Sequence, residues 1–71
     1  MQNKKAIDMH ANDIIRLNGI DFNVMDVQRL IICGRCEVVR AIVLVPESDG
    51  IHTSLLFEPE EMVLAKEGLL N

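Results

Sequence analysis

Apolar residues are densest between Glu37 and Val45, where seven of nine positions are hydrophobic and four are valine. β-branched side chains fit a pleated sheet well, whereas a helix restricts their χ1 rotamers more strongly. The run ends at Pro46, which lacks the N–H group that a paired strand needs. We therefore predict a central strand over residues 37–45, around which the rest of the chain folds.

Both faces of this predicted strand are apolar. Side chains alternate across a strand, so one face carries Val39, Ala41, Val43 and Val45, and the other carries Val38, Arg40, Ile42 and Leu44. A small antiparallel sheet usually packs one face on its own core and leaves the other to solvent. The strand is therefore either buried on both faces within the domain, or its second face is covered by a partner.

A first hairpin is predicted upstream of this strand. Asn18-Gly19 separates the apolar run 14–17 from the alternating run 20–27. Asn-Gly favours a type I′ turn because both central residues of that turn take positive φ. The alternation changes phase near Val24-Met25, which predicts a β-bulge and a bent strand.

A second hairpin is predicted between residues 30–33 and the central strand. Gly34-Arg35 would form its loop, because glycine in the first loop position is typical of a type II′ turn. That register makes three cross-strand pairs: Cys33 with Cys36, Ile31 with Val38, and Leu30 with Val39.

The C-terminal half contains a turn at residues 46–50 and an alternating strand at 51–57. Glu58-Pro59 ends this strand. Because proline is tolerated at a first helical position, we expect a single helical turn near residues 59–62. A short strand over 62–64 would follow.

The two ends of the chain lack a clear period. We expect residues 1–11 to form a flexible arm and residues 65–71 to form a tail, in which Leu69 and Leu70 are the side chains available for docking. Residues 12–64 would then hold the β structure. With only 71 residues there is room for one domain.

These elements predict an all-β fold, a small five- or six-stranded meander that closes into a barrel. The segment 13–24, with the sequence DIIRLNGIDFNV, resembles the opening hairpin of small SH3-like barrels, including the amino-terminal domain of elongation factor P. The resemblance extends over residues 13–64 by pattern. It implies an SH3-like barrel and, as one functional alternative, an RNA- or ribosome-associated protein.

Composition favours self-association. Hydrophobic residues make up 49% of the chain, which contains no Trp or Tyr and two Phe, so the core must be aliphatic. A chain this short buries only about 60% of the surface exposed when unfolded. The apolar surplus predicts a protein partner, and a second copy of the chain is the simplest one.

The charge balance argues against general binding to nucleic acid. The net charge is −4, with seven basic residues among eleven acidic ones, whereas phosphate binding needs clustered Lys and Arg. A local basic surface stays open as an alternative because most basic residues precede residue 41. The arginines that would contact phosphates are Arg16, Arg29, Arg35 and Arg40.

Cys33 and Cys36 form the one motif whose side chains could bind a metal or react. A structural zinc site needs four ligands, and His10 and His52 are the remaining soft or nitrogen ligands. A zinc-binding domain is therefore the lesser alternative, and two reduced thiols beside a hairpin turn are the principal interpretation. No secretory leader or membrane-length run is visible, so we expect a cytoplasmic protein. We also expect no cofactor.

The sequence favours a non-enzymatic protein-interaction module. No catalytic triad, glycine-rich phosphate loop or opposed carboxylate pair is recognisable. The partner would contact the second apolar face of the central strand, through residues Ile31, Val38, Arg40, Ile42 and Leu44. Strand addition and hydrophobic packing are the two modes of contact that such a surface offers.

Overall fold

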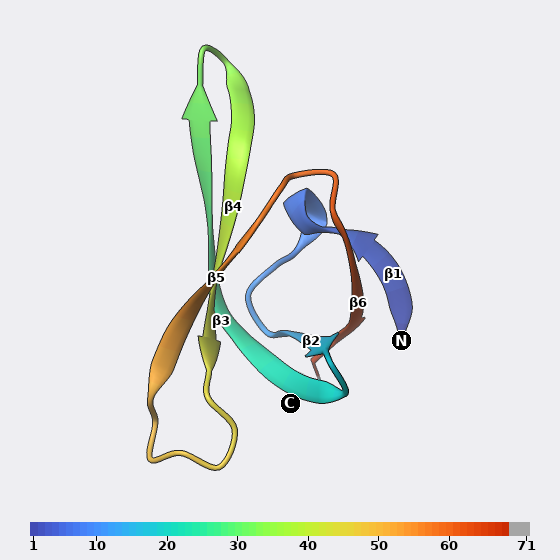
Figure 1. Ribbon diagram of the computed structural model, residues 1–71, viewed down its shortest axis with the longest axis vertical. Helices are drawn as coiled ribbons and strands as arrows, with labels where there is room; N and C mark the ends of the chain where they lie inside the picture. The colour runs from blue at the N-terminus through green and yellow to red at the C-terminus, as the bar shows by residue number, and fades with distance from the viewer. Residues whose placement is uncertain (69–71) are drawn as a thin grey trace.

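The chain forms one antiparallel sheet of six strands in a computed structural model that describes residues 1–68 (Figure 1). In chain order the elements are β1 (Gln2–Lys5), the 3₁₀ turn η1 (Ala6–Asp8), β2 (Asp13–Leu17), β3 (Ile20–Ile32), β4 (Arg35–Leu44), β5 (His52–Phe57) and β6 (Met62–Glu67). The predicted all-β class is therefore confirmed. Within residues 1–68 no helix is both long and apolar enough to cross a membrane.

The strand order is β1-β6-β2-β3-β4-β5. Strands β2 to β5 form the predicted meander, and β6 returns to pair with β2 on one side and β1 on the other. Figure 1 shows that the sheet curls strongly. Among the described residues no ladder joins β1 to β5, so the sheet is open rather than closed into a barrel.

The predicted first hairpin is confirmed. Leu17 pairs with Ile20, and the two loop residues Asn18 and Gly19 have φ of 51° and 77°. Positive φ at both loop positions defines a type I′ turn.

The bulge near Val24-Met25 is also confirmed. Val24 pairs with Val43 and Asp26 pairs with Ile42, so Met25 is the extra residue. The predicted runs 20–27 and 30–33 belong to one strand, however, because the ladder resumes after the bulge and β3 continues over 13 residues. The β3–β4 ribbon therefore extends past the rest of the sheet as an arm (Figure 1).

The register at the end of this arm differs from the prediction. Cys33 and Gly34 are the loop residues, with φ of 52° and 80°, so the turn is type I′ and begins one residue earlier than expected. Ile31 consequently pairs with Cys36. Leu30 pairs with Val38, and the register shift between these two pairs leaves Glu37 without a partner on β3. A type I′ turn follows the right-handed twist of a long two-stranded ribbon, which explains why it is adopted here.

The expected N-terminal arm is wrong, because residues 1–11 contribute to the sheet and the core. β1 pairs with β6, and Ala6 and Met9 are fully buried. The Ala6 N–H donates to the Glu61 carbonyl at 2.8 Å, and the Ile7 N–H donates to the Pro59 carbonyl at 3.0 Å. A small sheet leaves part of its inner face uncovered, and these apolar side chains cover it.

The C-terminal elements are also shifted. Residues 58–61 form a tight turn, closed by the Glu61 N–H and the Glu58 carbonyl at 3.1 Å, and not the helical turn expected near 59–62. β6 runs to Glu67, so the strand replaces the start of the predicted tail because its neighbours β1 and β2 pair with it on both sides. The predicted docking residues Leu69 and Leu70 lie outside the described residues.

The core lies on the concave face of the sheet, under η1. Its buried apolar members are Ala6, Met9, Ile15, Val24, Val39, Ala41, Val43, Phe57, Val63 and Ala65. As the composition required, all but one are aliphatic or thioether side chains. The predicted inner face of the central strand is therefore confirmed at Val39, Ala41 and Val43.

Candidate interaction surface

The face of β3, β4 and β5 that points away from the core carries a cluster of apolar side chains. On β4 this face alternates with the buried residues and contains Val38, Arg40, Ile42 and Leu44. Cross-strand pairing adds Leu30 opposite Val38 and Leu56 opposite Arg40. We call these residues the outer patch: Leu30, Val38, Arg40, Ile42, Leu44 and Leu56.

The outer patch is only partly covered by the chain itself. Leu30 is 54% exposed and Leu56 is 67% exposed, while Val38, Ile42 and Leu44 are half-buried between neighbouring side chains. The patch therefore presents hydrophobic surface from three adjacent strands to solvent.

Two members of the outer patch were missed by sequence reasoning. Leu56 interrupts the polar side of β5, and this exception was a signal visible in the sequence. Leu30 changes face because Glu37 is an extra residue in β4. Ile31 was placed on this surface and lies on the opposite face, since its partner Cys36 packs toward the core. That expectation was wrong because the extra residue Glu37 changes the register at the end of the arm.

The end of the β3–β4 arm is apolar on both faces. Leu30, Ile31 and Ile32 are 54%, 56% and 48% exposed. Successive strand residues point to opposite faces, and the arm projects beyond the curled body of the sheet (Figure 1). The outer patch therefore continues into an exposed apolar tip.

Arg40 lies near the middle of the outer patch. Its Nη1 donates to the Gln28 Oε1 at 3.3 Å across the β3–β4 ladder. The methylene chain of Arg40 can thus cover apolar surface while its guanidinium stays at the solvent side.

The other arginines proposed for phosphate contacts have partners within the protein. The Arg16 Nε lies 2.7 Å from the Asp21 Oδ1, and the Arg35 Nε lies 3.4 Å from a Glu37 carboxylate oxygen. Hydrogen bonding from the Arg16 guanidinium lowers the pKa of Asp21 and the same contact raises the pKa of Arg16. These residues do not form a basic surface of their own.

Arg29 is engaged in the same way. Its guanidinium donates to the backbone carbonyl oxygens of Ile7 and Met9. This contact is structural, and it removes a third arginine from the set available to phosphates.

The candidate zinc ligands are separated among several elements. Cys33 is exposed in the turn at the end of the arm, and Cys36 is half-buried, with its Sγ 3.5 Å from the Val38 carbonyl. His52 begins β5, and His10 lies in the loop before β2. Across residues 1–68, no group of three or more His, Cys, Asp or Glu side chains is placed to hold a metal ion.

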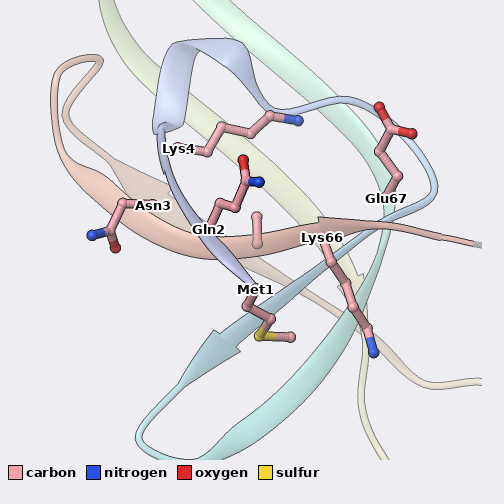
Figure 2. A pocket seen from close by; sticks show the side chains of 7 residues that line it. Met1, Gln2, Asn3, Lys4, Lys66 and Glu67 are labelled. Atoms are coloured by element: carbon pink, nitrogen blue, oxygen red, sulfur yellow. The ribbon is translucent and has the colours of Figure 1, made fainter.

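A hollow of about 420 Å³ lies over the β1–β6 ladder. Figure 2 shows Gln2, Lys4 and Glu67 on one side of this hollow, with Lys66 directed to the other side. The Lys4 ammonium is already bound to the Asp13 carboxylate at 2.9 Å. Of the polar side chains that line the hollow, Lys4 is therefore engaged in a structural contact.

No protein-family model matches the sequence, and neither a curated protein nor a solved structure matches the chain.

Proposed function

We propose that this protein is a non-enzymatic interaction module that self-associates through the outer patch. The observation that carries the proposal is that one face of three adjacent strands holds exposed or half-buried apolar side chains, with the polar residues Asp26, Gln28 and Ser54 between them. The apolar ones are Leu30, Val38, Ile42 and Leu56. Burying apolar surface releases about 25 cal/mol per Å², so even part of such a patch supplies a useful driving force.

The accessible surface supports a partner. A compact monomer of this mass exposes about 4,450 Å², whereas this chain of 8.0 kDa exposes 5032 Å². Typical stable interfaces bury about 800 Å² on each partner. The extended arm and the outer patch therefore provide surface on the scale that a dimer needs.

The curled sheet supports an open relative of the SH3-like barrels. The bulge at Met25 bends β3, and β6 returns to pair with β2, so both devices bring the ends of the meander toward each other. The exposed free thiol of Cys33 suits a reducing cytoplasm.

The test compares two leucines that each lie opposite an arginine on a neighbouring strand. Leu56 is opposite Arg40 in the outer patch, and Leu64 is opposite Arg16 on β6. Replacing either by glutamate introduces one charge beside an existing opposite charge, which limits the cost to the fold.

The wild-type protein is expected to have the molar mass of a dimer, as measured by size exclusion coupled to light scattering. Leu56→Glu is expected to shift it to a monomer at the same concentration, because it places a carboxylate in the contact. Leu64→Glu is expected to remain dimeric, and circular dichroism checks that both variants fold. A wild-type monomer at every concentration, or equal dissociation by both variants, would contradict the proposal.

A further inference from the structure

β5 is an edge strand whose second side has no partner among residues 1–68. It pairs with β4 from Val39↔Phe57 to Leu44↔His52, and it ends the strand order of the sheet. An edge strand presents a row of unpaired N–H and C=O groups that another strand can complete.

The register identifies which backbone groups point outward. The Val45 N–H donates to the Ile51 carbonyl at 2.8 Å, so this pair is a hydrogen-bonded one. Hydrogen-bonded and non-hydrogen-bonded pairs alternate along an antiparallel ladder. Thr53, Leu55 and Phe57 therefore bond toward β4, while His52, Ser54 and Leu56 direct their N–H and C=O groups to the free side.

The two edges of the sheet are protected to different degrees. β1 is four residues long and carries Lys4 and Lys5, and Lys5 forms an ion pair with Glu60 at 2.8 Å. Short length and lysine are devices that discourage pairing at an edge. β5 has six residues, HTSLLF, with no Lys, Arg, Asp, Glu, Pro or Gly among them.

We propose that β5 pairs in antiparallel fashion with β5 of a second copy, across a two-fold axis at Ser54. This inference rests on the proposed self-association and specifies its geometry. Ser54 would face its symmetry mate, and His52 would face Leu56, so that every outward backbone group in the pair finds a partner.

Pairing at this edge would also bring Leu56 of the outer patch into the contact. In antiparallel pairing about an axis perpendicular to the sheet, directly opposed residues lie on the same face. The side chain of Leu56 is on the outer face, beside Arg40. On the outer face, Leu56 of each copy would therefore lie opposite His52 of the other, on either side of Ser54 at the axis.

A second copy fits this edge because the strand is self-complementary. The residues between His52 and Phe57 bring no like charges into opposition when the strand is paired with itself.

The test uses proline at the two edges. Ser54→Pro removes an outward N–H without removing a bond to β4, and Asn3→Pro is its counterpart on β1. Asn3 is the counterpart because the Ala6 N–H bonds to Glu61, and the alternation from that pair directs the Asn3 N–H outward.

Ser54→Pro is expected to weaken dimerisation roughly tenfold or more, because both copies lose an outward donor. Asn3→Pro is expected to leave the dimerisation constant unchanged. A dimer that survives Ser54→Pro but is dissociated by Leu56→Glu would overturn the edge pairing while leaving the proposed function intact. Loss of the dimer in both proline variants would also overturn it, since the effect would not be specific to β5.

Hydrogen exchange of the wild-type protein gives a readout that needs no variant. The Ser54 amide is expected to exchange slowly at high protein concentration and to lose that protection on dilution. The Asn3 amide is expected to exchange rapidly at both concentrations. Rapid exchange of the Ser54 amide in a confirmed dimer would rule out this pairing. Protection of Ser54 that appears only after an unrelated strand is added would also rule it out, because β5 would then pair with that strand and not with a second copy.

Discussion

The Arg29 guanidinium on β3 is bound to the backbone of Ile7, with its Nε 3.1 Å and its Nη2 2.9 Å from the Ile7 carbonyl oxygen. The same Nη2 lies 2.8 Å from the Met9 carbonyl oxygen. One side chain at the base of the arm thus holds η1 over the sheet, where Ala6 and Met9 complete the core.

Arg29→Ala is expected to lower the free energy of unfolding by about 1–2 kcal/mol, since hydrogen bonds from a charged donor contribute about 1.5–3 kcal/mol when buried and less when exposed. Arg29→Lys is expected to recover only part of the loss, because an ammonium does not reproduce the planar fork. Urea denaturation of the three proteins measures these differences. An unchanged midpoint in Arg29→Ala would show that η1 is held by its apolar contacts alone.

Asp13 is the buried acidic group of the fold, with 4% of its surface exposed. Its Oδ2 accepts hydrogen bonds from the Lys4 ammonium and the His10 N–H, each at 2.9 Å. Asp13→Ala is expected to cost about 3 kcal/mol because it leaves both donors without an acceptor. Asp13→Asn keeps an acceptor oxygen and is expected to cost less, as thermal unfolding would show.

The Lys5–Glu60 ion pair supplies the matched control for Asp13. Its two charged groups are 2.8 Å apart, but the side chains are 51% and 74% exposed. Solvent screens such a pair and its net contribution is small. Glu60→Gln is therefore expected to leave the unfolding midpoint unchanged, and a loss comparable to that of Asp13→Ala would contradict the distinction between the two pairs.

Local sequence signals predicted the parts of the fold that depend on local geometry. Asn18-Gly19 specified its turn because few residues accept positive φ at both positions. The change of phase near Met25 specified the bulge because one extra residue is needed to keep both halves of β3 on the core side.

Elements whose position depends on distant contacts were not predictable in this way. Residues 1–11 have no period of their own, and β1 forms because β6 offers an edge. The turn at Cys33-Gly34 was placed one residue late, because the choice between two turn types depends on the twist of the whole ribbon. The extra residue Glu37, at the second register shift, then moved Ile31 off the outer patch and brought Leu30 onto it.

The Arg16–Asp21 pair predicts a pH dependence at low pH. Hydrogen bonding from Arg16 lowers the pKa of Asp21 in the folded protein below the value it has when unfolded. As the pH falls, the unfolded state therefore binds a proton first, so the stabilising contribution is complete above the pKa of the unfolded state and is lost as the pH falls through the lower pKa of the folded state.

Arg16→Gln is expected to raise the pKa of Asp21 toward its ordinary value, as measured by an NMR titration of the side-chain carboxyl. The effect on stability is expected to be small because both side chains lie in solvent, with 46% and 42% of their surfaces exposed. An Asp21 titration that is identical in the two proteins would show that the guanidinium does not act on this carboxylate in solution.

Gly68 follows β6 and lies against the backbone of Asn12. A Cβ atom built on Gly68 would overlap the Asn12 carbonyl oxygen. Asn12 itself is fixed in the left-handed region, with φ of 77°, and its N–H donates to the Val24 carbonyl at 2.8 Å. The turn therefore has little freedom to move away, and Gly68→Ala is expected to cost about 1–3 kcal/mol, in the range of other overpacked sites.

Glu67→Ala is the control, because it alters the neighbouring exposed residue without adding an atom near Asn12. If Gly68→Ala unfolds at the same urea concentration as the wild type, the chain after β6 must leave the Asn12 turn in solution.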